Sequence, residues 1–469
     1  MARWPVAGAL AVCLLSVLLC GCQPRARDSR PNLLIILIDT ARADHLGCYG
    51  HHRPTSPNID RLAERATLFD NAVAQSSWTL PSIASLLTGL YPTRHQAINI
   101  KSRLPLWRVT LPEILQERGY RTGAVISNTL VSSKYNMHQG FDDFDESMKG
   151  DYLDVTSEEV SNRAIQWLKD NHRDPFFLFL HYYDPHHAYI EHPGFEFSEP
   201  YGGWIDPKAR LQQIRTRLWA VKPRDAAYLA SLYDSEIAFT DHHVGRVLKT
   251  LDRLGLDGST LIVITSDHGE EFMEHGWLGH TRDLYEEIVH VPLILRNPAM
   301  PEMPSHFHPP VELIDIMPTL LEMLGVSWDN SGIDGASFMG ALSGAAYSDT
   351  IAFSDMCMLP IADRTGQTEA FPDDGIKYYD IRSLRMGHWK LVRNMTEGNC
   401  EIYNLRSDPG ETVNLTGATV DPWFHFMEQE LLRWIDAVEN LALTENAAPD
   451  SFALDAETEE RLRSLGYIQ

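Results

Sequence analysis

Three polar residues that could bind a metal follow two apolar, β-branched runs of the chain. Asp39 ends the run at 33–38, and Asp267 and His268 end the run at 261–265. Short uninterrupted runs of this kind are typical of strands buried on both faces of a parallel sheet, whose ligands collect at the carboxyl ends. Each residue alone could be a strand-end cap. Together, Asp39, Asp267 and His268 predict a metal site.

A nucleophile is the second expectation, because the stretch 78–89, which includes the hydroxyl of Thr79, lies between these two runs. A divalent ion held by Asp39, Thr79, Asp267 and His268 would lower the pKa of the hydroxyl and neutralise charge on a bound anion. The imidazole in this donor set favours manganese or zinc, and the carboxylates would also accept calcium. The competing interpretation is that Thr79 is an ordinary helix cap.

The elements that must position these residues alternate between strand and helix patterns. Residues 122–127 and 176–180 read as strands, and 110–119, 157–171 and 228–254 as helices. This alternation predicts an α/β sandwich around a mostly parallel sheet.

The later chain is organised differently. Residues 343–380 are irregular in pattern, with acidic residues and prolines, whereas 381–392 alternate like one half-exposed antiparallel strand. We therefore expect a core domain at 31–342, an irregular connection at 343–380 and a C-terminal subdomain at 381–469.

The order of several motifs resembles the type I sulfatases of the alkaline phosphatase superfamily. The resemblance covers most of the chain and includes Ser56-Pro57-Asn58-Ile59-Asp60, Ser85-Leu86-Leu87-Thr88-Gly89, Asp267-His268-Gly269, Val291-Pro292-Leu293-Ile294 and Trp389-Lys390-Leu391. It implies an alkaline phosphatase-like α/β/α sandwich. It also implies a small antiparallel C-terminal subdomain, with a helix at 423–441, beside the active-site rim.

By the same resemblance, two histidines join the catalytic group. His186 matches a histidine on the leaving-group side of the ester, and His280 matches the Lys or His that sulfatases offer to the anion. His280 could protonate the leaving oxygen or bind an anionic oxygen, while His275 is expected to shape the loop. Asp184, His186 and His280 could also hold a second metal.

The chain departs from the sulfatase pattern at the nucleophile. Sulfatases carry Cys-x-Pro-Ser-Arg, whose Cys is oxidised to formylglycine, whereas this chain has Thr79 and Ile83 at the Cys and Arg positions. The family's Lys and His are replaced by Ser127 and Thr129, which leaves Asn128 as a polar contact. Arg94 could supply the missing positive charge. Thr79 favours phosphorus chemistry, because a threonine sulfate lacks the second hydroxyl through which a hydrated aldehyde expels sulfate.

Composition excludes one class of partner. The 469 residues carry a net charge of −24, and nucleic-acid binding requires a basic footprint. At this length we expect one large domain with a smaller appendage.

The first 22 residues predict export. Arg3, an apolar run and Leu19-Cys20-Gly21-Cys22 resemble a lipoprotein signal peptide, which would make Cys22 the lipidated first residue and 23–30 a tether. An ordinary cleaved signal or an uncleaved anchor is the alternative. We expect a lipid-anchored protein of the bacterial cell envelope, periplasmic or outer-membrane in a Gram-negative host. Of the remaining cysteines, Cys357 and Cys400 could pair.

Three functions agree with these observations. The first is an exported metal-dependent hydrolase or transferase acting with Thr79 on phosphomonoesters, phosphodiesters or phosphoglycerol-type groups of envelope glycans or lipid head groups. The second is a sulfuric ester hydrolase acting on sulfated glycans. The third is an inactive protein that binds anionic glycans, which the complete ligand set argues against.

Overall fold

The computed structural model describes residues 30–148, 154–186, 188–206, 208–347, 351–357, 380–417, 422–445 and 450–464. The predicted signal peptide, Cys22 and nearly all of the tether lie outside them. No helix among the described residues combines the length and the apolar character needed to span a bilayer.

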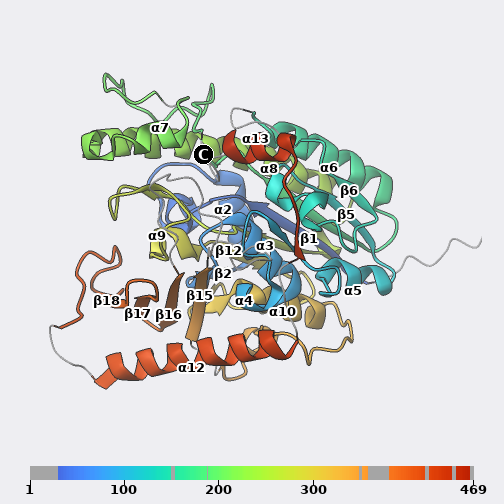
Figure 1. The fold of residues 1–469 in the computed structure, drawn as a ribbon. Coiled ribbons are helices and arrows are strands. Elements are labelled where there is room, and N and C mark those ends of the chain that lie inside the picture. The colour runs from blue at the N-terminus through green and yellow to red at the C-terminus, as the bar shows by residue number, and fades with distance from the viewer. Residues whose placement is uncertain are drawn as a thin grey trace, which may run out of the picture.

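An eight-stranded sheet forms the centre of the molecule (Figure 1). β12 runs antiparallel to its neighbours β8 and β2, and the other pairings are parallel. The predicted α/β/α sandwich around a mostly parallel mixed sheet is therefore confirmed. In spatial order the strands are β13 (His306–Phe307), β2 (Thr67–Phe69), β12 (Leu293–Arg296), β8 (Thr260–Thr265), β1 (Asn32–Ile38), β7 (Phe176–Tyr182), β5 (Arg121–Val125) and β6 (Asp143–Asp145).

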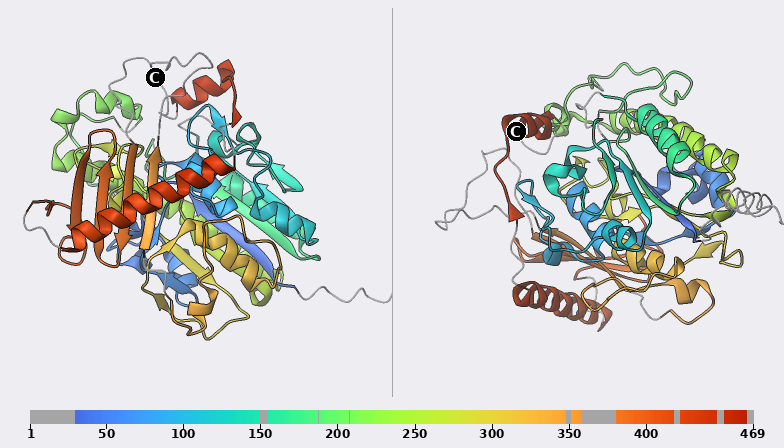
Figure 2. Two further views of the ribbon diagram at one scale, coloured as in Figure 1. Left: turned by 60° about the horizontal axis from the view of Figure 1, so that its bottom comes forward. Right: turned by 90° about the vertical axis from the view of Figure 1, so that its right-hand side faces the viewer.

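Helices cover both faces of this sheet (Figure 2, right). Alternate residues of β1 explain why, since Leu33, Ile35 and Leu37 join one apolar core and Leu34, Ile36 and Ile38 join the other. All six are buried, as expected for a central strand. The first face carries α3 (Thr79–Thr88), α5 (Leu111–Glu117), α10 (Ile316–Met323) and α11 (Met339–Leu342), and the second α2 (Pro57–Ala63), α6 (Ser157–Asn171) and α8 (Pro223–Arg253).

Short elements connect these layers. They include α4 (Pro92–His95), α7 (Leu211–Arg215), α9 (Glu286–Val289), the pairs β9 (Glu271–Phe272) with β10 (Leu278–Gly279) and β4 (Ser102–Arg103) with β19 (Asp450–Ser451), and the sheet of β11 (His290–Val291), β3 (Ala72–Val73) and β14 (Val311–Glu312). Single helical turns are η2 (Ala43–His45), η3 (Gly47–Tyr49), η4 (Thr129–Val131), η5 (Ser133–Tyr135), η6 (Leu218–Ala220), η7 (Asp257–Ser259) and η8 (Leu313–Asp315).

A small antiparallel sheet forms the expected C-terminal unit, with α12 (Pro422–Thr444) across one face (Figure 2, left). Phe353 and Trp434 stack between sheet and helix, with ring centroids 4.6 Å apart. The strands are β15 (Ile351–Cys357), β16 (Asp380–Met386), β17 (Trp389–Asn394) and β18 (Asn399–Asn404).

Two details of this unit differ from the prediction. β15 lies inside 343–380, which we expected to be irregular, and pairs with β16 along its whole length. The predicted single strand at 381–392 is a hairpin of β16 and β17, because Gly387 adopts a φ of +60° and reverses the chain. The last described helix, α13 (Ala456–Ser464), instead packs on the main domain through buried Leu462.

The suggested pairing of Cys357 with Cys400 is wrong. The two residues lie on the outer strands β15 and β18, with β16 and β17 between them. Three strand spacings amount to roughly 14 Å, whereas disulfide-bonded Cα atoms lie within about 7 Å. Cys400 is a free thiol.

Candidate active site

Asp39, Asp267 and His268 meet at the carboxyl ends of neighbouring strands. Asp39 follows β1, and Asp267 and His268 follow β8, which pairs with β1 in parallel register. All three side chains are fully buried, and one ligand atom from each lies within 4.8 Å of the others. The sheet topology therefore builds a compact donor group from residues more than two hundred positions apart.

The free oxygens of the two carboxylates indicate a cation position. Asn128 Nδ2 donates to Asp39 Oδ2 at 2.8 Å, and the backbone N–H groups of Thr40 and His268 donate to Asp267 Oδ1. Asp39 Oδ1 and Asp267 Oδ2 are buried without a hydrogen-bond partner. Such oxygens are costly unless a cation or proton satisfies them, so the donor set fits a divalent metal.

His268 presents one nitrogen to this pair of carboxylates. Its Nδ1 lies 2.9 Å from the carbonyl oxygen of Gly269, so Nδ1 carries the hydrogen. Nε2 lies 3.8 Å from Asp39 Oδ1 and 3.5 Å from Asp267 Oδ2. The backbone contact therefore favours the tautomer in which Nε2 carries the lone pair that a metal ion would need.

The pKa values of the two carboxyls move in opposite directions. Burial raises the pKa of Asp267 to about 6, with a further contribution from the charge of Asp39. Burial opposes ionisation of Asp39 as well, but the contacts with His181, His186 and His268 outweigh it and lower the pKa of Asp39. Repulsion between two close negative charges separates their pKa values in this way. A bound cation would favour the ionised form of both carboxyls.

Thr79 is the first residue of α3, directly after the extended Trp78. Its side chain is fully buried, and its Oγ1 lies 3.4 Å from Nε2 of His268. The hydroxyl therefore lies beside the donor group and at a helix N-terminus, where backbone N–H groups and the helix dipole favour an anion.

Two further histidines line the site. The His280 ring centroid lies 4.4 Å from that of His268 and 4.9 Å from that of His186. Burial, with the neighbouring His268, holds the pKa of His280 well below its usual range. Its Nδ1 lies 2.9 Å from Glu270 Oε1, which orients the neutral ring.

The carboxylate and phenols that orient these histidines were not identified from sequence. Tyr183 Oη lies 2.8 Å from His186 Nδ1, and Tyr189 Oη donates to Glu270 Oε2 at 2.8 Å. The only sequence signal for these three residues was their closeness along the chain to predicted site residues. Tyr183 and Tyr189 flank His186, and Glu270 follows the Asp267 turn. His181, for which no role was assigned, lies with Nε2 3.4 Å from Asp39 Oδ2.

A second metal at Asp184, His186 and His280 is not supported by the described residues. Asp184 caps helix α6, because its oxygens accept from Thr156 N, Thr156 Oγ1 and Ser157 N. These three hydrogen bonds occupy the Asp184 carboxylate in capping α6, so Asp184 has a structural role.

Arg94 does not supply the missing positive charge. It is buried against Asp334 and Glu445, with Nη1 2.6 Å from Asp334 Oδ1. Ser127 donates to the carbonyl oxygen of His181, and only Asn128 of that segment touches Asp39.

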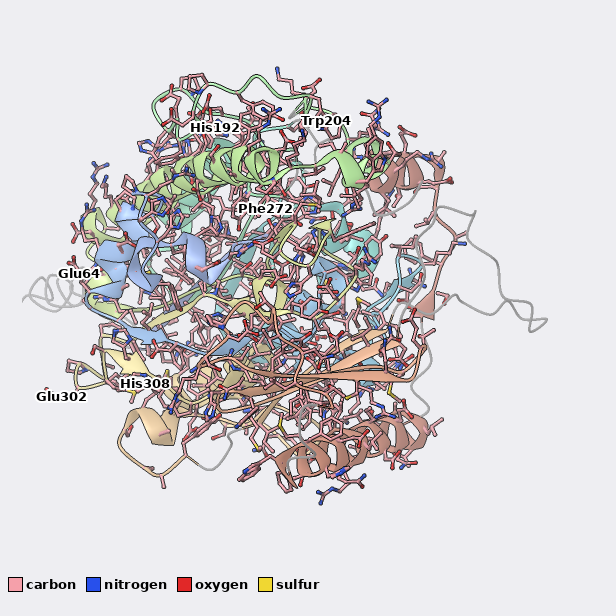
Figure 3. The ribbon with its side chains drawn as sticks, turned by 90° about the vertical axis from the view of Figure 1, so that its left-hand side faces the viewer. Glu64, His192, Trp204, Phe272, Glu302 and His308 are labelled. Atoms are coloured by element: carbon pink, nitrogen blue, oxygen red, sulfur yellow. The ribbon has the colours of Figure 1, made fainter. Side chains whose placement is uncertain are left out.

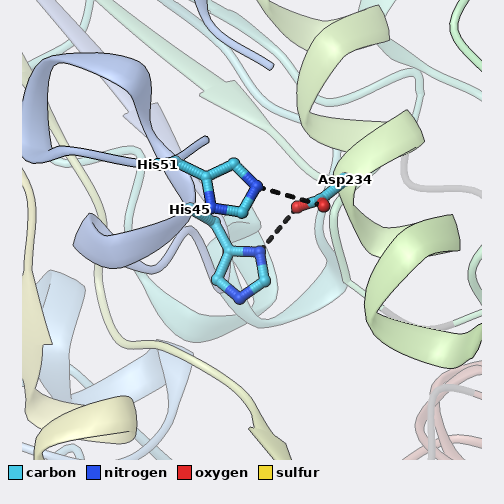
Figure 4. Close-up of side chains that lie close together, drawn as sticks. All are labelled: His45, His51 and Asp234. Atoms are coloured by element: carbon cyan, nitrogen blue, oxygen red, sulfur yellow. Dashed lines mark hydrogen bonds and ion pairs between the residues drawn. The ribbon is translucent and has the colours of Figure 1, made fainter. Parts of the chain in front are cut away.

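A second donor group links the loop after β1 to helix α8 and is called the clasp below. It consists of His45 and His51 from the loop and Asp234 from the helix. Figure 4 shows both imidazoles directed at the carboxylate, with His45 Nδ1 2.6 Å and His51 Nε2 3.1 Å from its oxygens. Arg53 Nη1 also donates to Asp234 Oδ2 at 2.7 Å. The arginine already balances the carboxylate charge, so this cluster requires no metal.

A third group combines Glu271 and Glu274, in the segment after Asp267, with Glu287 of helix α9. Arg42 pairs with Glu274, and His275 Nδ1 lies 2.5 Å from Glu287 Oε1. Burial opposes protonation of His275, but Glu287 outweighs it and raises the pKa of His275 to about 9. His275 thus has the loop-shaping position expected from sequence.

Comparison with known proteins places the fold and site in a family. The sulfatase family model matches residues 31–326. The chain is 24% identical over 511 residues to the N-acetylglucosamine-6-O-sulfatase of Bacteroides thetaiotaomicron, covering 87% of this chain and 86% of that protein. It is 29% identical over 370 residues to human iduronate 2-sulfatase, covering 64% and 66%. The phosphonate monoester hydrolase of Agrobacterium radiobacter shares the fold with a TM-score of 0.69, at 21% identity over 88% of this chain and 96% of that one.

The chain therefore belongs to the sulfatase family, within the alkaline phosphatase superfamily. It is a hydrolase of the class that acts on sulfate or phosphate esters, and such enzymes are typically metal-dependent.

Proposed function

We propose that this protein is an exported, metal-dependent esterase that uses Thr79 as its nucleophile on phosphorus esters. The observation that carries the proposal is the position of the Thr79 hydroxyl, buried 3.4 Å from His268 Nε2 beside the orphaned oxygens of Asp39 and Asp267. A threonine that only capped α3 would need none of these donors. The phosphonate monoester hydrolase among the structural neighbours supports phosphorus chemistry on this fold.

Asp39, Thr79, Asp267 and His268 would hold one divalent metal, for which manganese or zinc suits the mixed oxygen and nitrogen donors. When bound, such an ion neutralises anionic charge and lowers the pKa of a neighbouring hydroxyl. Asn128 and the backbone N–H groups of Thr40 and His268 fix the two carboxylates, so these ligands are oriented before an ion arrives.

Thr79, the N-terminus of α3 and the two histidines would bind the ester and transfer its protons. Thr79 Oγ1 gives up its proton and forms a bond to phosphorus, while the bond from phosphorus to the leaving oxygen breaks and that oxygen takes up a proton. Water or an alcohol then attacks phosphorus, which breaks the bond to Oγ1 and restores the Thr79 hydroxyl. The N-terminus of α3 favours the anionic group beside Thr79. His280, whose Nδ1 lies 2.9 Å from Glu270 Oε1, would carry protons to and from the reacting oxygens. His186, which Tyr183 contacts through its Nδ1, would lie on the leaving-group side.

The identity of the nucleophile as threonine is the reason that we propose phosphate esters and not sulfate esters as substrates. A hydrated formylglycine expels sulfate through its second hydroxyl, and Thr79 has only one. A phosphothreonine can be released by attack at phosphorus. The substrates we propose are phosphomonoesters, phosphodiesters or phosphoglycerol-type groups of envelope glycans or lipid head groups.

A sulfuric ester hydrolase is the second candidate, because both relatives described above are sulfatases of carbohydrates. Matched aryl esters separate the two candidates. We expect aryl phosphodiester or phosphonate turnover to exceed aryl sulfate turnover in the metal-loaded enzyme. Efficient hydrolysis of the sulfate with a weak response to phosphorus esters would reverse this order.

We also propose that Cys22 carries lipid and anchors the protein in the bacterial envelope. Metabolic labelling with a fatty acid should tag the wild type and not Cys22→Ser. Label retained in the Cys22→Ser variant would refute the anchor.

A further inference from the structure

A strongly basic segment beside the active site has no place in the chemistry described so far. Residues 208–224 contain six Lys or Arg (Lys208, Arg210, Arg215, Arg217, Lys222, Arg224) and no Asp or Glu, in a chain whose net charge is −24. We call residues 208–224 the basic strip. A local excess of one sign against the overall charge attracts a partner of opposite sign.

The basic strip touches the segment that carries His280. Within it, α7 packs against β10, and Arg215 Nε donates to the carbonyl oxygen of Leu278 at 2.8 Å. The guanidinium carbons of Arg215 and Arg282 lie 4.8 Å and 4.5 Å from the ring centroid of Trp277. A molecule lying on the strip would therefore reach the rim of the catalytic site.

Exposed aromatic residues accompany the positive charge. Trp219 in the strip is 87% exposed, and Trp204 is 39% exposed. Figure 3 shows Trp204 at the outer edge of the molecule, and its Nε1 donates to the carbonyl oxygen of Ala220, which joins the two loops. Large exposed apolar rings of this kind often mark interaction surfaces.

A hollow of about 350 Å³ continues the strip at the start of α8. Arg53, Tyr201, Arg224 and Tyr228 contribute to its lining. The two tyrosine rings stack with centroids 3.8 Å apart, and Tyr201 Oη donates to buried Asp225. Because Asp234 holds Arg53, the clasp of Figure 4 also fixes one wall of the hollow.

We propose that the basic strip and this hollow bind a linear anionic polysaccharide alongside the catalytic site. Arginine and lysine would contact its acidic groups, and the aromatic rings would pack against the apolar faces of its sugars. Three cations of the strip and the hollow have carboxylate neighbours, namely Arg53 at Asp234 (2.7 Å), Arg210 near Glu460 (3.8 Å) and Arg224 near Asp225 (3.5 Å), and Glu199 also lines the hollow. Arg217 and Lys222 are exposed to solvent, so their positive charges are the most accessible to an anionic ligand.

The alternative of an anionic membrane fits the geometry less well. The described chain begins beside α5, where Arg30 contacts the carbonyl oxygens of Arg118 and Gly119. α7 lies at the opposite end of the molecule from α5 (Figure 1). With Cys22 lipidated, as proposed above, residues 23–30 would span at most roughly 28 Å, so residue 30 and the α5 end would stay closer to the anchoring membrane than the strip.

Binding of dextran sulfate, with neutral dextran as reference, tests this surface. All proteins carry Thr79→Ala, so that the measurement needs no catalysis and does not depend on the proposed function. Arg217→Glu with Lys222→Glu should weaken dextran sulfate binding at low salt by roughly tenfold or more. Lys249→Glu with Arg253→Glu makes the same charge change at exposed positions far along α8 and should leave binding within about twofold.

Quenching of tryptophan fluorescence and a fall in affinity with added salt are the expected readouts for the Thr79→Ala protein. Equal weakening by the two double variants would show that only net charge matters and would overturn the proposal. Equal affinity for dextran and dextran sulfate would also overturn it. Anionic vesicles that bind while dextran sulfate does not would assign the surface to a membrane instead.

Discussion

The Thr79 hydroxyl and the His268 imidazole lie 3.4 Å apart, although 189 positions separate them in the chain. The contact depends on β8 pairing directly with β1, because this pairing brings the turn after β8 next to Asp39 and the start of α3. The proposed nucleophile and the proposed metal ligands are thus held by the centre of the fold, as a preorganised site requires.

Asp267→Asn should abolish tight metal binding. The substitution removes the charge of the carboxylate whose Oδ2 is buried without a partner, while the backbone donors to Oδ1 remain. Elemental analysis of protein after dialysis should give one manganese or zinc per wild-type chain and a marked loss in Asp267→Asn. Glu271→Gln serves as a control in the neighbouring acidic loop. Equal metal content in wild type and Asp267→Asn would place the ion elsewhere.

Asn128→Ala should weaken the metal site without removing a ligand. The Asn128 amide donates to Asp39 Oδ2, and loss of such a supporting contact typically reduces metal affinity roughly 10–100-fold. Competition with a chelator of known affinity measures the change. Ser127→Ala is the matched control, because its hydroxyl donates to the His181 carbonyl and not to Asp39. Unchanged affinity in Asn128→Ala would show that Asp39 needs no such support.

The stability given by His275 should depend on pH. Pairing with Glu287 raises the pKa of His275 to about 9 in the folded protein, above the unfolded value of 6.5. The stabilisation is therefore complete below about pH 6.5 and is lost as pH rises through 9. His275→Gln should lower the thermal midpoint at pH 6, and the difference from wild type should shrink by pH 10. A constant difference across this range would mean that the charge of His275 does not contribute.

Cys357 and Cys400 should both be reduced in the purified protein, even after exposure to air. Their strands are separated by two others in the four-stranded sheet. Alkylation under denaturing, non-reducing conditions followed by mass spectrometry should label both. A peptide pair joined by these cysteines would contradict the sheet order.

Much of this fold followed from local pattern in the sequence. The helix at 157–171 agrees with α6 residue for residue, and the apolar runs before Asp39 and Asp267 are the neighbouring strands β1 and β8. What was missed depends on long-range pairing. β15 was not recognised because the sequence around it is rich in acidic residues and prolines, which is typical of a loop. Only Gly387 marked the turn that divides 381–392 into two strands.

The residues of the candidate site also fall into those that the sequence predicted and those that it did not. Asp39, Thr79, Asp267, His268, His186 and His280 were identifiable from strand ends and family motifs, and the structure brings them together. Asn128 was expected as a polar contact of the site, but its partner Asp39 was not foreseen. The contacts of Tyr183 with His186 and of Glu270 with His280 were not predicted, since each depends on the particular position of a side chain. Asp184 was misread because capping of α6 and metal binding use the same carboxylate chemistry.

Substitution of Thr79 separates a nucleophile from a helix cap. Thr79→Ala should reduce turnover of an aryl phosphodiester by at least about 10³-fold, because nucleophile and metal-facing oxygen are lost together. Thr79→Ser should retain partial activity, since the hydroxyl remains. Activity of the wild type should not require a formylglycine-generating enzyme. Circular dichroism should show that both variants stay folded.

Identification of the covalent intermediate tests the central claim most directly. Wild-type enzyme quenched during turnover of an aryl phosphorus ester, digested and sequenced by mass spectrometry, should carry the phosphoryl or phosphodiester group on Thr79. Ser77 and Ser82 are the nearby competing hydroxyls, and both are buried. A label on either serine, or full activity in Thr79→Ala, would contradict the account.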